Sequence, residues 1–251
     1  RSSRTEEFLK NIEKIVPFEK IDYLIMNHSE PDHSGALPAI MARAPQAKVV
    51  VSKNGQLSLG RHYPGNWNVQ VVKTGDTIAL GIRSLRFFEA QMVHWPDSMF
   101  TYCPEDRTLF SNDAFGEHLA ASSVFIDEAD ISEVWQEAVK YFANILNPYS
   151  QQIQKKIKEF LSLNWPVETI CPSHGLIWRK DATAIVNKYM EWASGNVEKS
   201  AVILFDTIWG GTEKMAEAIG KGLEAEGIPY KMFNAGASDL NDVITEIFKA
   251  K

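Results

Sequence analysis

The feature that most limits how this chain can fold is a cluster of four candidate metal ligands within six residues. The segment reads His28-Ser-Glu30-Pro-Asp32-His33, and it directly follows the mainly apolar run 21–26. A short apolar run of this kind predicts a buried strand. Clustered imidazoles and carboxylates repel one another or lose hydration unless a cation compensates them. We therefore expect a layered fold in which a sheet holds a metal-binding loop at the end of a strand.

Three further candidate ligands lie just past other predicted strands. The full set contains four histidines, one glutamate and two aspartates: His28, Glu30, Asp32, His33, His94, Asp113 and His174. Such a set suits two metal ions, each with two imidazoles and a terminal carboxylate, and it leaves one carboxylate over as a bridge. The other two histidines, His62 and His118, are interpreted as surface residues.

Other interpretations of individual ligands stay open. Asp32 can cap a helix that starts near Gly35, and Asp113 can be a turn residue. Cys171 precedes His174 by three residues, but its apolar strand favours a buried structural thiol, as does the setting of Cys103. A set of imidazoles and carboxylates without thiolate favours non-haem iron. The alternative is a dinuclear zinc hydrolase, in which a metal-bound hydroxide attacks an ester or lactam.

The order of predicted elements indicates an α/β architecture. Helices are predicted over 6–16, 36–44, 133–146, 151–163, 182–193, 213–226 and 241–250. Strands are predicted over 21–26, 48–52, 69–73, 84–89, 99–102, 108–111, 167–171, 201–205 and 229–233. We expect the four strands between residues 69 and 111 to be hairpins of one sheet.

The polar segment 195–199 predicts a linker between two domains, 1–194 and 200–251. After the linker, a new strand–loop–helix–strand pattern begins. It contains one βαβ unit and half of another, which cannot bury a parallel sheet on both faces. We therefore expect the second domain to be truncated.

The loop that opens this second unit has the composition of a phosphate-binding loop. It comprises Thr207, Ile208, Trp209, Gly210, Gly211 and Thr212. Backbone N–H groups, hydroxyls and the positive end of the following helix can together wrap a phosphate. The loop lacks the Gly-x-Gly-x-x-Gly dinucleotide pattern, and an ordinary capped βα turn is the alternative.

Composition excludes several classes of protein. With 26 basic and 32 acidic residues the net charge is -6, so the basic surface of a nucleic-acid binder is missing. No apolar run reaches the roughly 18 residues of a membrane span. The first residues lack the apolar core of a signal peptide. Two cysteines are too few for a disulfide scaffold, which predicts a reducing, cytoplasmic location.

Taken together, the motifs resemble those of flavodiiron proteins, also called A-type flavoproteins. The matching strings are Asn27-His-Ser-Glu-Pro-Asp-His-Ser-Gly, His94-Trp-Pro-Asp-Ser-Met-Phe-Thr-Tyr, Leu109-Phe-Ser-Asn-Asp-Ala-Phe-Gly and Pro172-Ser-His-Gly-Leu-Ile-Trp-Arg. The resemblance implies a metallo-β-lactamase-like αββα sandwich whose first hairpins are missing, followed by the start of a flavodoxin-like, doubly wound domain. Hydrolytic members of that superfamily typically carry His at the position of Glu30, and the exchange accompanies iron.

The resemblance also implies roles for these residues. One iron ion would be held by His28, Glu30 and His94, the other by Asp32, His33 and His174, and Asp113 would bridge them. The loop from Thr207 to Thr212 would hold the phosphate of FMN. The implied activity is reduction of O₂ to water, of NO to N₂O, or of both. Electrons would come from rubredoxin, a flavin reductase or a reduced deazaflavin, and the chains would form a head-to-tail homodimer or a dimer of dimers.

Overall fold

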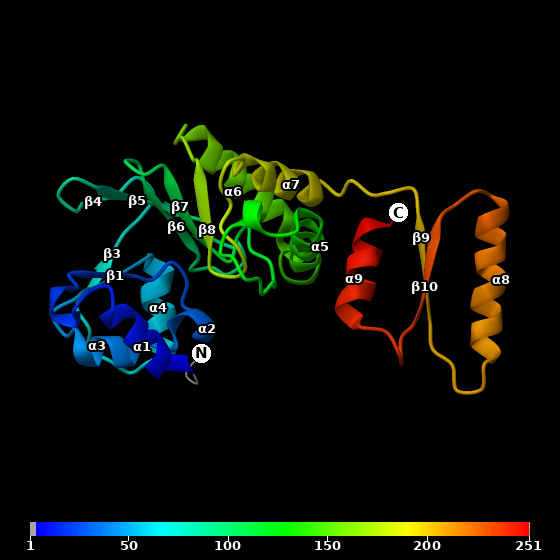
Figure 1. The fold of residues 1–251 in the computed structure, drawn as a ribbon, viewed down its shortest axis with the longest axis horizontal. Coiled ribbons are helices and arrows are strands. Elements are labelled where there is room, and N and C mark those ends of the chain that lie inside the picture. The colour runs from blue at the N-terminus through cyan, green and yellow to red at the C-terminus, as the bar shows by residue number, and fades with distance from the viewer. Residues whose placement is uncertain (1–3, 251) are drawn as a thin grey trace.

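The computed structural model describes residues 4–250, and its architecture confirms the predicted α/β class. Two sheets pack face to face with helices on both outer sides, and a smaller βαβα unit follows them along the chain (Figure 1). Among the described residues, no helix combines the length and apolar character that crossing a bilayer requires.

The first sheet has three parallel strands in the order β1-β2-β3. Their bounds are Tyr23–Ile25, Lys48–Val51 and Val69–Val71. Helices α2 (Pro31–Ser34) and α3 (Leu37–Arg43) connect β1 to β2, and α4 (Lys53–His62) connects β2 to β3. Helix α1 (Thr5–Glu13) and the 3₁₀ turn η2 (Phe18–Lys20) precede the sheet. An apolar cluster that includes Leu37, Val49 and Leu59 joins the helices to one face of this sheet.

The second sheet has five strands in the order β4-β5-β6-β7-β8. Their bounds are Thr77–Ala79, Ser84–Glu89, Met99–Cys103, Thr108–Asn112 and Thr169–Pro172. The pairs from β4 to β7 are antiparallel, whereas β7 and β8 run parallel. Val50 from the first sheet packs with Phe87 and Met99 from the second, so the two sheets share a buried layer.

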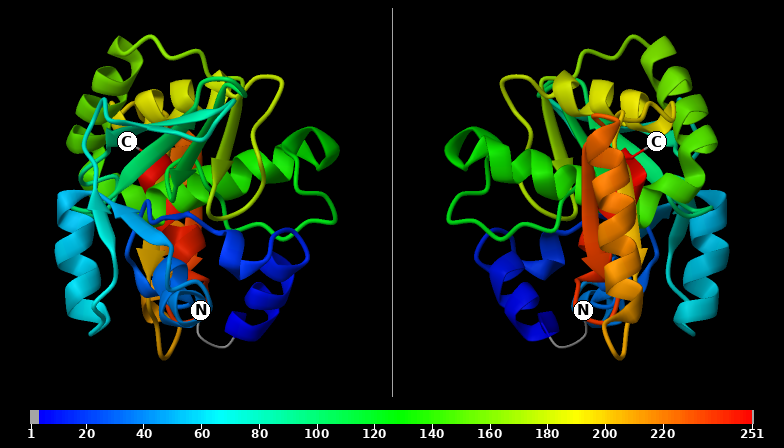
Figure 2. Two further views of the ribbon diagram at one scale, coloured as in Figure 1. Left: turned by 90° about the vertical axis from the view of Figure 1, so that its left-hand side faces the viewer. Right: turned by 90° about the vertical axis from the view of Figure 1, so that its right-hand side faces the viewer.

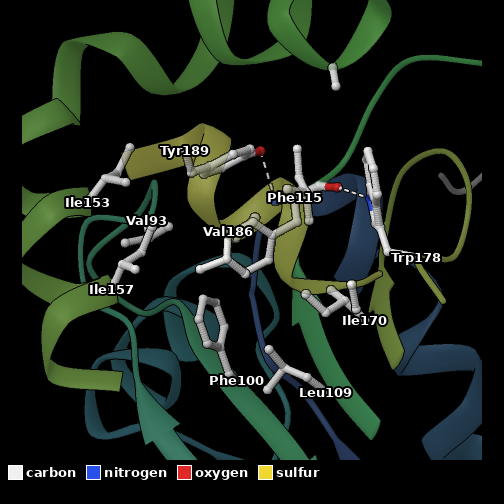
Figure 3. Close-up of a cluster of buried hydrophobic side chains, with 14 of the residues drawn as sticks. Val93, Phe100, Leu109, Phe115, Ile153, Ile157, Ile170, Trp178, Val186 and Tyr189 are labelled. Atoms are coloured by element: carbon white, nitrogen blue, oxygen red, sulfur yellow. Dashed lines mark hydrogen bonds between the residues drawn. The ribbon is translucent and has the colours of Figure 1, made fainter. Parts of the chain in front are cut away.

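Three helices cover the outer face of the second sheet: α5 (Ile131–Tyr141), α6 (Ser150–Ser162) and α7 (Thr183–Ala193). The turn η3 (Ile126–Glu128) precedes α5, and the π-helical turn η4 (Phe142–Leu146) and η5 (Asn147–Tyr149) lie between α5 and α6. The predicted αββα order of layers is therefore confirmed. The largest apolar cluster lies under these helices and includes the fully buried rings of Phe115, Trp178 and Tyr189 (Figure 3).

The smaller unit consists of β9 (Ala201–Phe205), α8 (Gly211–Ala225), β10 (Tyr230–Asn234) and α9 (Leu240–Lys249). Its two strands pair in parallel, and α8 covers one side of the pair (Figure 2, right). Helix α9 faces the first unit, where the Phe142 and Phe248 rings lie 5.6 Å apart. The extended segment before β9 contains the predicted linker. The domain division remains a prediction, and its outer boundaries, residues 1 and 251, lie outside the described residues.

One predicted pairing was wrong. Residues 69–73 were expected to belong to the hairpin sheet, but β3 pairs in parallel with β2 in the other sheet. The cause is helix α4, which sequence patterning did not predict and which supplies the crossover that parallel pairing requires. The helix contains Gly55 and Gly60, which disfavour helix, but the Ser52 hydroxyl caps it by accepting a hydrogen bond from the Gly55 N–H. The short strand β4 was also not predicted.

Candidate metal centre

The structure brings all seven predicted ligands together at one edge of the two sheets. His28 and Glu30 follow β1, and α2 carries Asp32 and His33. His94 lies between β5 and β6, Asp113 follows β7, and His174 follows β8. Side chains that lie up to 146 positions apart in the chain therefore meet because the strands end at the same place.

Asp113 lies at the middle of the group, and its two oxygens face different histidines. Its Oδ2 atom lies 3.2 Å from Nε2 of His28 and 3.4 Å from Nε2 of His94. Its Oδ1 atom lies 2.9 Å from Nε2 of His33 and 3.2 Å from Nε2 of His174. The carboxylate therefore separates two pairs of imidazoles.

Each imidazole pair has one further carboxylate. Oε2 of Glu30 lies 3.2 Å from Nε2 of His28 and 3.7 Å from Nε2 of His94. Oδ2 of Asp32 lies 3.2 Å from Nε2 of His174 and 3.4 Å from Nε2 of His33. The arrangement is thus two sets of two imidazoles and one carboxylate, with Asp113 between them.

The central carboxylate is buried and faces imidazoles. Asp113 is 1% exposed, and neither of its oxygens accepts a hydrogen bond from a backbone N–H, a hydroxyl or an amide group among the described residues. Burial favours its neutral form, but the facing imidazoles of His174, His33 and His94 outweigh this effect and hold its pKa well below the ordinary range. A buried anion in this state needs a compensating cation. The donor set fits that need, because ligand atoms of His28, Glu30, His33 and Asp113 lie within 4.8 Å of one another, as do those of Asp32, His33 and His174.

Asp97 belongs to the site, although sequence reasoning did not single it out. Its carboxylate is buried and lies 3.2 Å from Nδ1 of His28, and it accepts hydrogen bonds from the Ser29 N–H at 2.7 Å and hydroxyl at 2.6 Å. Burial acts to lower the pKa of His28, but Asp97 and the neighbouring Asp113 raise it. The sequence did contain a signal, because Asp97 lies three residues after the candidate ligand His94, within the same string that resembles flavodiiron proteins.

The open side of the site is a pocket of about 560 Å³. It is lined by five of the candidate ligands and by Pro31, His118, Tyr141 and Ile145. His118 is exposed, as its surface assignment predicted, but its ring lies 5.5 Å from that of His174. Tyr141 and Ile145 add a largely uncharged wall. Periodicity gave no signal for either residue, because both occupy ordinary positions at the end of a predicted helix.

The remaining alternatives can be compared with this geometry. Asp32 lies inside α2, and the residue at the N-cap of α3 is Ala36, so Asp32 does not cap that helix. Cys171 lies in β8, where burial raises the pKa of its thiol, and it belongs to neither ligand group. His62 is exposed, and its ring stacks near Trp95.

The predicted phosphate loop precedes α8. The Thr207 hydroxyl accepts a hydrogen bond from the Gly210 N–H at 2.9 Å, and Gly210 has a φ of 75° at the N-cap. No side chain caps α8, so N–H groups of its first turn remain available to a ligand. Trp209 is 94% exposed beside them. This geometry is compatible with a phosphate, and the loop residues stay a prediction.

Comparison with known proteins assigns the family. Residues 2–175 match the family described as ODP family beta lactamase. The chain belongs to this ODP family. The matched range contains all seven candidate ligands and Asp97, whereas the predicted phosphate loop lies beyond its end.

Relatives of this ODP-family chain are longer proteins. It is 49% identical to a "Nitric oxide reductase" of Moorella thermoacetica over 98% of this chain and 62% of that protein. The solved structure of rubredoxin oxygen:oxidoreductase from Desulfovibrio gigas matches with a TM-score of 0.96 and 37% identity over 100% of this chain and 63% of that one. The flavodiiron protein from Giardia intestinalis matches with a TM-score of 0.92 and 33% identity, over 98% and 60% of the two chains. The predicted resemblance to flavodiiron proteins is confirmed, and the chain spans about three fifths of these relatives.

Proposed function

We propose that this chain carries a dinuclear iron site and belongs to an oxidoreductase that reduces NO, O₂ or both. The observation that carries the proposal is the buried Asp113 carboxylate, whose two oxygens face two sets of imidazoles and accept no hydrogen bond from a backbone, hydroxyl or amide group among the described residues. The names of the relatives support this activity, since one is a nitric oxide reductase and another a rubredoxin oxygen:oxidoreductase.

In this proposal, His28, Glu30 and His94 would hold one ion, and Asp32, His33 and His174 would hold the other. Asp113 would be shared between the two. When bound, two iron ions supply electrons and open coordination positions for a small diatomic molecule. The ligand chemistry supports iron, because carboxylate oxygens and imidazoles are mixed and no thiolate contributes.

The chain's own residues orient these ligands and shape the approach to them. The Asp97 contact favours a proton on Nδ1 of His28, which leaves the lone pair of Nε2 directed at Asp113 and Glu30. Tyr141 and Ile145 line the pocket with rings and methyl groups in place of charges. Such a wall suits an uncharged diatomic molecule better than an anionic ester or lactam.

The second part of the proposal concerns electron delivery. Thr207, Ile208, Trp209, Gly210, Gly211 and Thr212 would hold the phosphate of FMN, whose ring chemistry would supply electrons to the site. The donor to the flavin would be rubredoxin, a flavin reductase or a reduced deazaflavin, and the chains would pair head to tail as a dimer or a dimer of dimers. A cytoplasmic location is consistent with two cysteines that form no disulfide.

Metal analysis and a visible spectrum of the purified protein test this proposal against a dinuclear zinc hydrolase. We expect two iron ions per chain and, where FMN is bound, a flavin band. Zinc, no colour and hydrolysis of a β-lactam or an ester would support the alternative. Asp113→Ala should lose at least one iron ion together with most NO or O₂ consumption. Two retained irons and near-normal turnover would contradict the bridging role.

A further inference from the structure

The segments that carry Asp113 and His174 are fastened to each other behind the site. We propose that Tyr189 and Trp178 are positioning residues, which hold the Asp113 loop by both backbone groups of Phe115 and so set the spacing between Asp113 and His174. This inference rests on the proposed dinuclear site, and it adds residues that contact no ligand atom.

The Asp113 loop has a backbone that its sequence alone does not favour. Asn112 has a φ of 48° and Phe115 a φ of 69°, in the left-handed region that residues with side chains rarely adopt. Polar contacts of the side chains of Ser111 and Asn112 hold one end of it. Asn112 donates from Nδ2 to the Met99 carbonyl at 2.8 Å, and the Ser111 hydroxyl donates to the Ala114 carbonyl at 2.7 Å. Backbone of this kind persists where the surrounding structure over-determines it.

Two buried aromatic side chains hold the other end. The Phe115 N–H donates to the Tyr189 hydroxyl at 2.8 Å, and the Phe115 carbonyl accepts from Nε1 of Trp178 at 2.7 Å. Figure 3 shows the two rings approaching Phe115 from opposite sides, with both hydrogen bonds drawn. Tyr189 and Trp178 are fully buried, so water cannot replace either partner. The orientation of the Phe115 backbone is therefore fixed from outside the loop.

Tyr189 and Trp178, which we call the clamp residues, both follow His174 in the chain. Further contacts join the Asp113 loop directly to the segment that carries His174. The Glu117 N–H donates to the His174 carbonyl at 3.3 Å, and the Leu176 N–H donates to Oε1 of Glu117 at 2.6 Å. A Cβ atom at Gly175, where φ is 82°, would lie 2.5 Å from the Glu117 side chain. The Asp113 loop is thus hydrogen-bonded to the chain after His174 both at Phe115 and at Glu117.

This arrangement explains why two residues 61 positions apart hold Oδ1 and Nε2 at 3.2 Å. If the Asp113 carboxylate rotated, its two oxygens would no longer each face one of the two imidazole pairs. Loss of one clamp should therefore affect the metal site as well as the core, because partners outside the ligand shell commonly alter metal affinity by about 10–100-fold.

The test compares Tyr189→Phe and Trp178→Phe with the matched control Tyr102→Phe. Tyr102 is buried in the same apolar cluster, and its hydroxyl also bonds to the backbone, by donating to the Pro166 carbonyl, but it does not touch the Asp113 loop. Iron(II) and zinc(II) affinities are measured by chelator competition, and the iron form is examined by Mössbauer spectroscopy. We expect at least about tenfold weaker metal binding and altered iron signals in the two clamp variants, with wild-type values in the control.

The outcomes separate this inference from the proposed function. Two irons per wild-type chain, with affinity and spectra unchanged in Tyr189→Phe, would overturn the positioning role and leave the diiron proposal standing. Two zinc ions in place of iron would overturn the diiron proposal, and the zinc affinities would still decide the positioning role. Loss of metal in Tyr102→Phe equal to that in Tyr189→Phe would indicate general destabilisation and contradict the inference. If Trp178→Phe does not fold, Tyr189→Phe, which lacks one oxygen atom, decides alone.

Discussion

Nδ1 of His28 lies 3.2 Å from Oδ2 of Asp97, and this contact decides which imidazole nitrogen faces the candidate metal centre. Both side chains are buried, so no water competes for the interaction. With a proton on Nδ1, the unprotonated Nε2 points at Asp113 and Glu30. In the proposed metal site, the Asp97 carboxylate would therefore prepare His28 to bind a cation.

Asp97→Asn should weaken metal binding, because the amide can donate a hydrogen bond to Nδ1 and favour the proton on Nε2. Changes in such outer partners typically cost about 10–100-fold in affinity. Competition with a chelator measures the effect, and Asp22→Asn, which changes an exposed carboxylate that belongs to neither ligand group, is the control. Unchanged affinity in Asp97→Asn would show that the contact does not select the form of His28 that binds metal.

Glu117 should make the stability of the metal-free protein depend on pH. Burial raises the pKa of this carboxyl to about 8 from an ordinary value of 4.5. Between these values the folded chain keeps a proton that the unfolded chain releases, so the free energy of unfolding falls as pH rises. Each pKa unit corresponds to about 1.4 kcal/mol, which makes the fall on the order of a few kcal/mol.

Glu117→Gln should remove this component, because the amide is uncharged and its oxygen can still accept the Leu176 N–H. Urea unfolding from pH 5 to pH 9 in the presence of a chelator measures it, with the exposed Glu133→Gln as the control. The variant should gain stability relative to wild type toward pH 9. Parallel stability curves for the two proteins would mean that Glu117 titrates near its ordinary pKa.

Glu30→His tests whether ligand identity selects the metal. The exchange gives the set of His28, residue 30 and His94 a third imidazole and removes its carboxylate. This should shift the metal preference of the site toward zinc. Protein produced with both metals present and analysed for metal content gives the answer. Glu6→His, on the exposed side of α1, is the control for nonspecific binding by an added histidine. Uptake of iron alone by Glu30→His would contradict this selection.

Local chemistry and periodicity were sufficient to predict the seven candidate ligands and most strands. The ligand types cluster in the sequence, and apolar runs such as that of β2 mark buried strands whatever their partners. Non-local features were not predictable in this way. The parallel pairing of β3 depends on helix α4, whose two glycines weaken its helical pattern in the sequence. The role of Asp97 depends on His28, which lies 69 positions away. Likewise, nothing local to Tyr189 indicates that its hydroxyl meets the Phe115 backbone.

The last prediction concerns the loop before α8. If it holds the phosphate of FMN, Thr212→Val removes one hydroxyl donor at nearly constant volume, without disturbing the Thr207–Gly210 hydrogen bond inside the loop. A hydrogen bond to a charged partner contributes about 1.5–3 kcal/mol, and about 1.4 kcal/mol is tenfold in affinity. FMN binding should therefore weaken by roughly one to two powers of ten.

Thr207→Val should weaken FMN binding further, because it also leaves the Gly210 N–H without its acceptor. Titration of the flavin-free protein with FMN measures both variants, and Thr77→Val, an exposed threonine on β4, is the control. The metal content should stay constant, since the candidate ligands belong to other segments of the chain. An FMN dissociation constant equal to that of wild type in both loop variants would identify the segment as an ordinary βα turn, and electron delivery through this loop would have to be abandoned.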